Sequence, residues 1–462
     1  MSGPPHIAIV GGGITGLSAA LALSGDGRDR AEVTLLEAGQ RLGGRIRSIP
    51  FAGTVVDVGP EALLTAAPAA LDLCRRLGLS EELVAPLASR TSVWSRGRLR
   101  ELPPGILGGL PDGVGPVLRS GILSPLGAAR ASADLVLPRR NGHVDESVGA
   151  LIRQRLGREA LERMIEPLLG GIHGGDPDRL SVRATAPRLE ALSREHRSLI
   201  LGLRAAGRSA PAPGGPMFVT VPGGLERVVT RMREELRGVD IRCGQAVTGV
   251  KAIAGGGYRL ELSGSRSLDA DGVILTVPAF EAAGLLAEES PDAAAALREI
   301  SYNPVTIVWL AFPPGALDSQ PPGTGLLVPR SERRTISACT WASAKWPHLA
   351  ASGMVLLRCS VGRGNPHAAS LDGPELIGRV VADLRAAIGV RGHPSATHIE
   401  RLDRALPQYT VGHLERVERI REQVALLPAL ELAGAGYGGM GVPQCIAQGQ
   451  GAAERVASAL RP

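Results

Sequence analysis

The sequence predicts a protein of the α/β and α+β class. A discontinuous Rossmann-like nucleotide-binding domain carries an inserted helical domain and an inserted mixed-sheet substrate domain. A strand, a glycine-rich turn and a helix-forming stretch follow one another near the N-terminus, and the same order returns near the C-terminus. Strand patterns between residues 239 and 278 lead back to the same domain. The predicted division assigns residues 1–85, 211–295 and 411–462 to the nucleotide-binding domain, 105–210 to the helical insertion, and 86–104 with 296–410 to the substrate domain.

Length and composition describe a globular chain. The 462 residues suffice for two or three domains, and 44% of them are apolar and 21% charged. The net charge of +6 is compatible with an anionic ligand. No basic segment is interleaved with aromatic residues, so we expect no nucleic-acid partner. Lys251 and Lys345 are the only lysines, and such an arginine excess indicates codon bias, so arginine counts carry little functional weight.

The cysteines and the hydropathy pattern favour a cytoplasmic protein. The five cysteines are scattered without a CxxC pair, so neither a disulfide framework nor a metal site is predicted. No leader-like segment opens the sequence, and no apolar run approaches the roughly 20 residues that cross a bilayer. Peripheral contact with the inner face of a membrane, through the helical insertion, stays open. The cysteines are Cys74, Cys243, Cys339, Cys359 and Cys445.

The first element is a strand, turn and helix that bind a dinucleotide. Residues 6–10 form a short apolar stretch, and a helix-forming run follows the glycine turn. Gly11 permits the tight turn, Gly13 lets backbone approach a pyrophosphate, and Gly16 lets the helix pack closely on the strand. The helix start offers free N–H groups to phosphates. The predicted contacts are Gly11, Gly12, Gly13, Ile14, Thr15 and Gly16.

The second strand ends in an acidic residue, Glu37. It lies about 20 residues after the last glycine of the turn, where a carboxylate grips the ribose hydroxyls. An acidic group at this place would repel a 2′-phosphate, so NADP is disfavoured. The alternative is an ordinary glycine-rich turn with an exposed glutamate.

The residues after Glu37 distinguish the cofactor. Residues 37–45 read EAGQRLGGR, so two arginines flank a glycine pair that lets backbone approach a ligand. Residues 57–61 then read DVGPE. This combination resembles the second signature of the flavin amine oxidase and porphyrinogen oxidase superfamily, which implies FAD. The contacts that the resemblance implies are Glu37, Ala38, Arg41, Gly43, Gly44, Arg45, Gly59, Pro60 and Glu61.

Two rival cofactor assignments are weighed against FAD. An enzyme that uses NAD alone would share the first motif but not the second. A flavin monooxygenase or disulfide reductase would carry a second glycine fingerprint for NADPH. Residues 255–257 are three glycines between two strand patterns and indicate a hairpin turn instead. We therefore expect the substrate itself to reduce the flavin, and oxygen to reoxidise it.

The closing segment completes the predicted flavin site. A strand, a glycine-rich turn and a helix begin near residue 430, and the dipole of the helix could stabilise the negative charge of a reduced flavin. Met440, Gly441 and Val442 are the predicted contacts, and a plain helix cap is the alternative. Val247 resembles the residue whose backbone meets the adenine in this superfamily.

Further segments make the resemblance specific, and together they cover nearly the whole chain. Residues 436–449, GYGGMGVPQCIAQG, are similar to the closing flavin turn of oxygen-dependent protoporphyrinogen and coproporphyrinogen oxidases, most of all those of Gram-positive bacteria. The resemblance implies six-electron oxidation of coproporphyrinogen III to coproporphyrin III in haem biosynthesis, with hydrogen peroxide formed. Protoporphyrinogen IX is the alternative substrate, and a flavin amine oxidase or desaturase is the alternative activity. The other matching segments are 166–181, 194–200, 325–330, 345–348 and 406–413.

The composition agrees with a porphyrinogen rather than an amine. Four Tyr, four Phe and four Trp leave little for an aromatic cage around an amine. A large flat substrate with carboxylates needs aliphatic walls and a few cations. The pyrrole nitrogens manage their own protons, so no catalytic side chain is predicted. The resemblance also leaves room for hand-over of the porphyrin to a ferrochelatase.

Three side chains are candidates for substrate binding. Arg90 resembles a carboxylate-binding arginine of some members of the family. His173 lies in an apolar and glycine-rich stretch, and Lys345 could meet a propionate. A solvated or structural role is the alternative for each. Two departures weaken these assignments, because the family often has a basic residue near residues 65–67 and a tryptophan where Leu402 stands.

Overall fold

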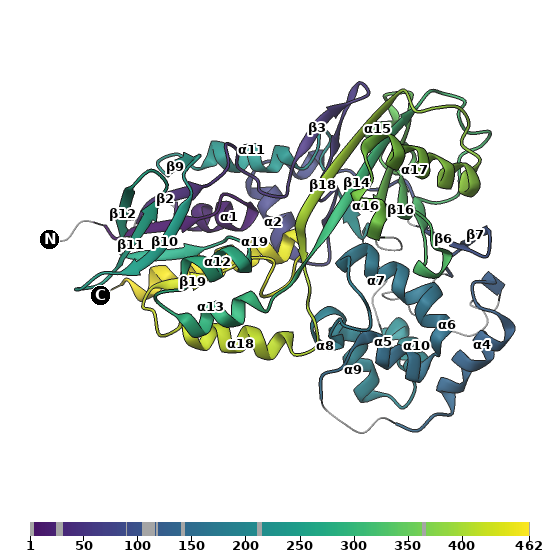
Figure 1. Ribbon diagram of the computed structural model, residues 1–462, viewed down its shortest axis with the longest axis horizontal. Coiled ribbons are helices and arrows are strands. Elements are labelled where there is room, and N and C mark those ends of the chain that lie inside the picture. The colour runs from purple at the N-terminus through teal and green to yellow at the C-terminus, as the bar shows by residue number, and fades with distance from the viewer. Residues whose placement is uncertain are drawn as a thin grey trace.

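The computed structural model describes residues 4–24, 31–88, 90–103, 116, 119–139, 144–209, 215–362 and 366–461. Three bodies are visible in Figure 1: a parallel sheet with its helices, a large twisted sheet, and a group of short helices below it. The predicted fold class is confirmed, because the parallel sheet is assembled from separated segments and the other two bodies lie between them in sequence. The domain bounds given above stay a prediction.

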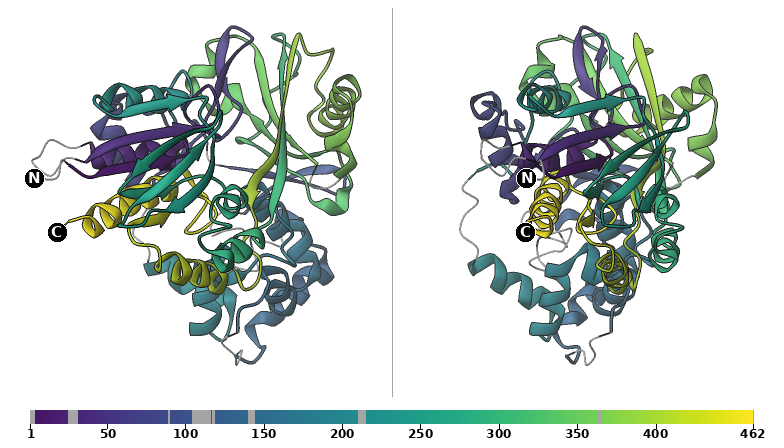
Figure 2. Two further views of the ribbon diagram at one scale, coloured as in Figure 1. Left: turned by 60° about the vertical axis from the view of Figure 1, so that its left-hand side comes forward. Right: turned by 90° about the vertical axis from the view of Figure 1, so that its left-hand side faces the viewer.

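The first body is a five-stranded parallel sheet in the order β19-β13-β1-β2-β9. Successive residues of β1 face opposite sides, so Ile7 and Ile9 join one apolar core and Ala8 and Val10 the other. Figure 2 shows α19 running beside the N-terminal segment, although more than 400 residues separate them. The strands are β1 (His6–Val10), β2 (Glu32–Glu37), β9 (Asp240–Cys243), β13 (Gly272–Leu275) and β19 (Leu430–Leu432).

Helices cover one face of this sheet, and a small antiparallel sheet with further helices covers the other. On the first face lie α1 (Ile14–Leu23), α2 (Pro68–Arg76), α11 (Glu226–Glu235) and α19 (Val442–Ala459). On the second lie β10 (Val247–Ala252), β11 (Tyr258–Leu262), β12 (Arg266–Ala270), α12 (Ala279–Leu285), α13 (Pro291–Arg298) and α18 (His413–Val424). The hairpin turn predicted at residues 255–257 joins β10 to β11, and all three glycines have positive φ.

The second body is a seven-stranded sheet in the order β18-β14-β17-β16-β15-β6-β7. Helix α17 (Gly373–Ile388) packs against one face, and the β3–β4 hairpin against the other. The strands are β6 (Ser92–Ser95), β7 (Arg98–Glu101), β14 (Tyr302–Phe312), β15 (Gly325–Leu327), β16 (Ile336–Trp341), β17 (Val355–Val361) and β18 (Ala396–Pro407). Shorter elements accompany the two sheets. They are β3 (Ser48–Phe51), β4 (Thr54–Asp57), β5 (Leu63–Leu64), η1 (Ser80–Glu82), β8 (Phe218–Val219), η4 (Arg330–Glu332), α14 (Ala342–Lys345), α15 (Pro347–Ala350) and α16 (Pro366–Ser370).

The third body is the helical insertion, which has its own apolar core. At its centre a buried ion pair joins Arg155 Nε to Asp134 Oδ1 at 2.5 Å, and Asp134 Oδ2 also accepts from the Ser198 hydroxyl at 2.6 Å. These extra bonds matter because a buried charge must be fully hydrogen-bonded to be tolerated. The elements are α4 (Pro125–Ser132), η2 (Ala133–Leu135), α5 (Val148–Arg155), α6 (Arg158–Ala160), η3 (Leu161–Ile165), α7 (Glu166–His173), α8 (Val182–Thr185), α9 (Pro187–Glu195) and α10 (Leu199–Ser209).

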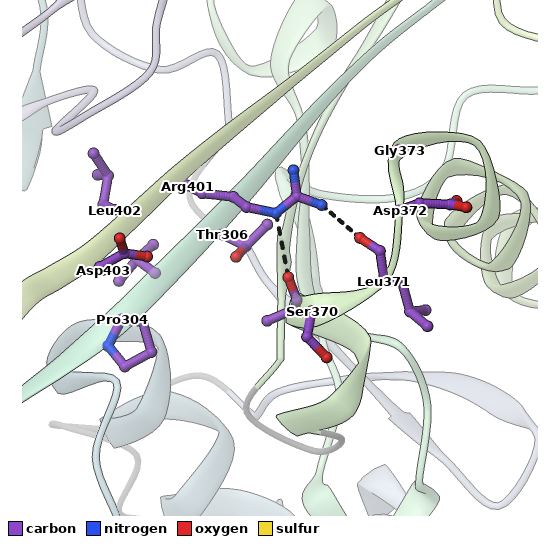
Figure 3. Close-up of a pocket in the computed structure, with 11 residues that line it drawn as sticks. Pro304, Thr306, Ser370, Leu371, Asp372, Gly373, Arg401, Leu402 and Asp403 are labelled. Atoms are coloured by element: carbon purple, nitrogen blue, oxygen red, sulfur yellow. Dashed lines mark hydrogen bonds between the residues drawn. The ribbon is translucent and has the colours of Figure 1, made fainter.

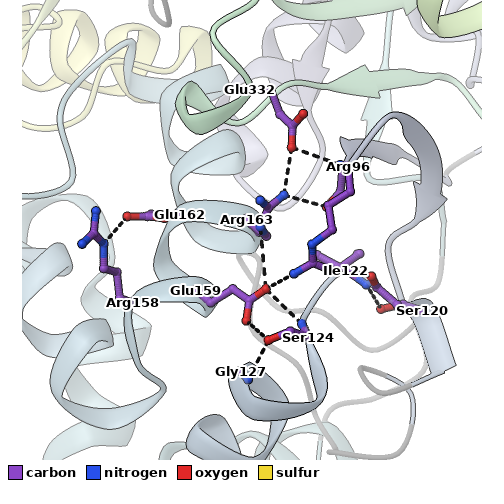
Figure 4. Close-up of polar contacts among 12 residues, drawn as sticks. Arg96, Ser120, Ile122, Ser124, Gly127, Arg158, Glu159, Glu162, Arg163 and Glu332 are labelled. Atoms are coloured by element: carbon purple, nitrogen blue, oxygen red, sulfur yellow. Dashed lines mark hydrogen bonds and ion pairs between the residues drawn. The ribbon is translucent and has the colours of Figure 1, made fainter.

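Charged side chains connect the helical insertion to the seven-stranded sheet (Figure 4). Glu159 of α6 pairs with Arg96, from the turn between β6 and β7, and accepts from the Ser124 hydroxyl at 2.6 Å. One turn along, Arg163 reaches Glu332 of η4 at 2.9 Å. The contact between the two bodies at this edge is therefore made by ion pairs.

The described residues contain no helix that is both long and apolar enough to cross a bilayer. Among the same residues, no group of three or more His, Cys, Asp or Glu side chains is arranged to hold a metal ion.

Candidate functional site

The turn between β1 and α1 brings backbone atoms close together and leaves one side open. A Cβ on Gly16 would lie 1.9 Å from the Gly11 carbonyl oxygen, so only glycine allows the helix to start here. Gly11 has φ +110°, a conformation that favours glycine. Gly13 is the N-cap of α1 and supplies no side-chain acceptor, and a Cβ on it would meet only the Gly44 Cα, at 4.0 Å. No side chain therefore caps the start of α1, and there is open space beside Gly13. Ile14 and Thr15 form its first turn.

Glu37 lies at the end of β2, beside this turn. Its two carboxylate oxygens accept hydrogen bonds from the backbone N–H groups of Gly12 and Gly39, each at 2.7 Å. Each carboxylate oxygen has a further lone pair, so ribose hydroxyls could be bound in addition. The exposed Ala38 follows, and the start of β10 at Val247 is held nearby because Gln245 N donates to the Glu37 carbonyl at 2.9 Å.

The second glycine motif pairs directly with the first. Gly43 N donates to the Gly12 carbonyl at 2.8 Å, and Gly43 has φ +104°. A Cβ on Gly44 would lie 3.2 Å from the Gly13 Cα, so the two loops touch through backbone. The guanidinium of Arg41 donates to carbonyls of its own loop, at 2.7 Å for that of Gly44. In this structure Arg41 holds the loop in shape.

The segment at residues 57–61 also approaches these loops through a glycine. A Cβ on Gly59 would lie 1.9 Å from the Arg45 carbonyl oxygen, and the Gly59 carbonyl accepts from Arg358 at 2.9 Å. The Arg45 guanidinium donates to the Arg404 carbonyl on β18. Pro60 is half-buried behind Gly59. The loops of the parallel sheet and the strands of the large sheet therefore meet at this point.

Glu61 forms a partly buried ionic cluster with two cations. Its carboxylate bonds Lys345 Nζ, and its other oxygen lies 3.6 Å from Arg358 Nε. The Glu61 and Lys345 side chains are only 17% and 16% exposed. Burial by itself would raise the pKa of the Glu61 carboxyl, but the charges of Lys345 and Arg358 outweigh it and the pKa is lowered. Sequence reasoning missed Arg358, which lies inside an alternating strand pattern that gives no signal.

Asp57 lies four residues before Glu61 and titrates in the opposite direction. It is buried, its Oδ1 accepts from the Ser48 hydroxyl at 2.6 Å and from Leu225 N at 3.0 Å, and burial raises its pKa to about 6. A carboxyl whose pKa is raised on folding adds stability below its unfolded pKa and loses it as pH rises through 6.

We therefore predict that Asp57→Asn removes a pH-dependent part of the free energy of unfolding. Wild type should gain roughly 1 kcal/mol relative to the variant when the pH is lowered from 7.5 to 5. Urea unfolding of both proteins at the two pH values measures this. An identical difference between them at pH 5 and pH 7.5 would contradict the assigned titration.

The C-terminal turn places a second helix start at the same edge of the sheet. α1 follows β1 and α19 follows β19, and these strands belong to one parallel sheet, so both helices begin at its carboxyl edge. Gly441 is the N-cap of α19 and supplies no side-chain acceptor, and no acidic residue stands in the first turn, which Val442 opens. Met440 precedes the cap and is half-buried.

These features fit an elongated cofactor with phosphate groups. Two uncapped helix starts offer N–H groups and positive dipole ends along one edge, and the space beside Gly13 is open. Glu37 places a carboxylate beside the first loop, where it could accept from sugar hydroxyls. The donor set, with an anion-binding helix start and an acidic residue at the next strand end, is that of a dinucleotide site.

The three predicted substrate-binding residues have different surroundings. His173, at the end of α7, is buried, and its Nδ1 has no hydrogen-bond partner among the residues that the structure describes. Burial lowers its pKa to about 4, so the imidazole is neutral near pH 7. The Arg90 side chain is 75% exposed and pairs with Glu101 at 2.9 Å. Lys345 is engaged by Glu61. Their roles toward a substrate stay predictions.

A groove of about 520 Å³ lies elsewhere, between β14, β18 and the start of α17 (Figure 3). Arg401 crosses it and donates to the Leu371 carbonyl at 2.7 Å. None of the predicted site residues lines it, although Leu402 does. This groove is therefore separate from the predicted cofactor site.

Known proteins resemble this chain along nearly its whole length. A coproporphyrinogen III oxidase of Bacillus subtilis is 36% identical over 97% of both chains, and one of Propionibacterium freudenreichii is 34% identical over 98% of this chain and 91% of its own. A protoporphyrinogen oxidase of Bos taurus is 31% identical over 97% and 98%. A crystal structure from Exiguobacterium sp. 255-15 superposes with a TM-score of 0.88 over 99% of both chains, at 32% identity.

The sequence profile of the flavin-containing amine oxidoreductases matches residues 14–457, from the first residue of α1 almost to the end of α19. The match begins directly after Gly13, and it includes the second glycine loop and the two inserted bodies. It confirms the superfamily that the motifs predicted. The chain belongs to the flavin-containing amine oxidoreductase family and is a flavin-dependent oxidoreductase.

Proposed function

We propose that the protein is an FAD-dependent oxidase that converts coproporphyrinogen III to coproporphyrin III in haem biosynthesis, with oxygen as the acceptor. One observation carries this proposal: the likeness to coproporphyrinogen III oxidases reaches 36% identity and extends through both inserted bodies. These bodies, rather than the nucleotide-binding part, differ between substrate classes of one superfamily. A flavin amine oxidase or desaturase is less favoured, because solved amine oxidases with the same fold are only about 17% identical.

FAD is the form of flavin that the site supports best. The start of α1 would bind its pyrophosphate, Glu37 its ribose hydroxyls, and the start of β10 at Val247 its adenine. The start of α19, with Met440 and Gly441, would lie at the flavin ring. FMN lacks the adenosine half and would leave Glu37 without a sugar to bind.

The bound flavin supplies the hydride acceptor for the oxidation. Complete oxidation removes six electrons from the porphyrinogen and reduces three molecules of oxygen to hydrogen peroxide. The chain's own residues bind and orient the macrocycle and exclude water, and the pyrrole nitrogens release the protons. His173 is neutral near pH 7 in the protein without substrate, so it would line a wall or donate one hydrogen bond. Arg90 and Lys345 are the proposed cations for substrate carboxylates.

Coproporphyrinogen III and protoporphyrinogen IX are the two candidate substrates, and they differ in charge. Coproporphyrinogen III carries propionates where protoporphyrinogen IX carries vinyl groups, and the similarity to the bovine protoporphyrinogen oxidase supports the latter as second candidate. We expect kcat/KM for coproporphyrinogen III to be larger by at least roughly tenfold, because each charge-assisted hydrogen bond contributes on the order of 1.5–3 kcal/mol.

Two assays test the proposal. Anaerobic coproporphyrinogen III should bleach the flavin absorbance of the holoenzyme, and aerobic turnover of both porphyrinogens, followed by porphyrin fluorescence, should rank them. The proposed reaction would be overturned if neither porphyrinogen bleached the flavin absorbance and an amine did. We also propose that the enzyme is cytoplasmic, touches the inner face of the membrane peripherally and passes its porphyrin to a ferrochelatase. Co-sedimentation with anionic vesicles measures the membrane contact. Co-sedimentation with the ferrochelatase measures the contact with that partner.

A further inference from the structure

One tyrosine hydroxyl holds both ends of the turn that leads into α19. Tyr409 is only 4% exposed, and its hydroxyl donates to the Ala435 carbonyl at 2.6 Å and accepts from Gly439 N at 2.9 Å. The Gly439 carbonyl is held from the other side by the Gln448 amide at 3.2 Å. Gly439 has φ +111°, so the chain reverses at this residue. Its two backbone polar groups are therefore fixed by two different side chains, which we call the Gly439 clamp.

The clamp lies directly before the start of α19. Two residues after Gly439 comes the N-cap Gly441, which has no side chain to direct the helix start. The orientation of the free N–H groups in the first turn thus depends on how the preceding turn is held. Gln448 belongs to α19 itself, whereas Tyr409 comes from another part of the chain. Tyr409 therefore holds the turn from outside helix α19.

Tyr409 is itself held through its ring and through its backbone. The His413 ring stacks on its ring with centroids 4.0 Å apart and an angle of 12° between the planes. The Tyr409 carbonyl accepts from Ser181 N of the helical insertion at 2.8 Å. The preceding residue, Gln408, donates from its amide to the His173 carbonyl at 3.0 Å. The segment that carries the clamp is thereby tied to the helical insertion.

We propose that Tyr409 is a positioning residue for the flavin: its hydroxyl keeps the N–H groups at the start of α19 aimed at the flavin ring and so favours the reduced, negatively charged form. The inference rests on the flavin part of the proposed function and does not require any one substrate. A helix start carries about half a positive charge, which stabilises an anion only within the first turn. A small rotation of the turn therefore changes how strongly the reduced flavin is stabilised.

Tyr409→Phe tests the clamp, because it removes the hydroxyl and keeps the ring that stacks on His413. Gly439 N–H and the Ala435 carbonyl lose their shared partner, and the turn relaxes. We expect the ratio of reduced to oxidised flavin, measured in the holoenzyme against a reference dye at fixed potential, to fall by roughly twofold to fivefold, the effect of a weakened helix-terminus interaction. Flavin absorbance reports this ratio directly, without turnover.

Tyr258→Phe is the matched control. Tyr258 is also a buried phenol, and its hydroxyl makes one bond of 2.6 Å to the Pro428 carbonyl from strand β11, away from the turn. This variant should lose a similar amount of stability and leave the flavin ratio unchanged. Gln448→Met releases the Gly439 carbonyl and should shift the flavin ratio in the same direction as Tyr409→Phe. If Tyr409→Phe does not fold, Gln448→Met takes its place as the test.

An unchanged flavin ratio in both Tyr409→Phe and Gln448→Met would overturn the inference, and so would an equal shift in Tyr258→Phe. The failure of the proposed function has a different signature. A wild-type holoenzyme that holds flavin but oxidises neither porphyrinogen would refute the proposed substrate, while the ratio in the three variants would still decide the role of Tyr409.

Discussion

Gly13→Glu should weaken flavin binding severely and leave the protein folded. A Cβ at this position meets only the Gly44 Cα at 4.0 Å, so the structure has room for a side chain. A carboxylate at a helix start is favourable in the protein without cofactor. It would nevertheless lie where the pyrophosphate is expected, and two like charges about 4 Å apart repel by on the order of 4 kcal/mol near a protein surface. We expect binding to weaken by about a thousandfold.

Titration of the apoprotein with FAD, followed by flavin fluorescence, measures the loss, and a thermal melt of the apoprotein tests the fold. Gly13→Ala is the control, since it adds the same Cβ without a charge and should bind FAD within a few fold of wild type. Gly16→Ala should instead fail to fold, because its Cβ would lie 1.9 Å from the Gly11 carbonyl. Tight, stoichiometric FAD in Gly13→Glu would show that the pyrophosphate lies elsewhere.

Lys345→Met should destabilise the protein by about 3 kcal/mol. The substitution leaves Glu61 in a site where both side chains are less than one fifth exposed, with Arg358 as its remaining cation at 3.6 Å. Removing one partner of a buried pair typically costs about 3–5 kcal/mol, because the other charge stays buried. In wild type the pKa of Glu61 is lowered, so its contribution is present above its unfolded pKa and is lost as pH falls through the folded value.

Urea unfolding of Lys345→Met, Glu61→Gln and the double variant measures the coupling between these two residues. The double variant should recover most of the loss of Lys345→Met, because no carboxylate then remains without its lysine. Strictly additive losses would contradict the ion pair. The same series bears on the substrate: if Lys345 binds a propionate, Lys345→Met should also raise KM, whereas a purely structural pair would leave KM unchanged in folded protein.

The glycine positions were predictable because geometry restricts them to one residue type. Gly11 and Gly43 have positive φ, and Gly16 and Gly59 carry a close backbone contact that any Cβ would prevent. Such constraints leave a recognisable spacing of glycines in the sequence. The superfamily, and through it the fold class, followed from these local patterns. Glu37 was predictable for the same reason, since it closes the strand next to the turn.

The side-chain partners were not predictable, because they come from distant parts of the chain. Lys345 was singled out as a rare lysine, but no local pattern indicates that Glu61, far away in sequence, is its partner in the structure. The cofactor contact of Arg41 stays a prediction, and no local pattern indicates that its guanidinium donates to carbonyl groups of its own loop. Tyr409 lies in a segment that the family resemblance included, yet no local pattern indicates that its hydroxyl reaches Gly439.

The assembly of the parallel sheet from three separated segments has a consequence for biosynthesis. β1 and α1 are made before β13 and β19, which lie beyond β1 in the sheet and end at Leu275 and Leu432. Until α19 is complete, the apolar face of α1 lacks the helix that covers it. The growing chain therefore exposes a strand edge and an apolar helix face until α19 has been made, and the cofactor site can be completed only then.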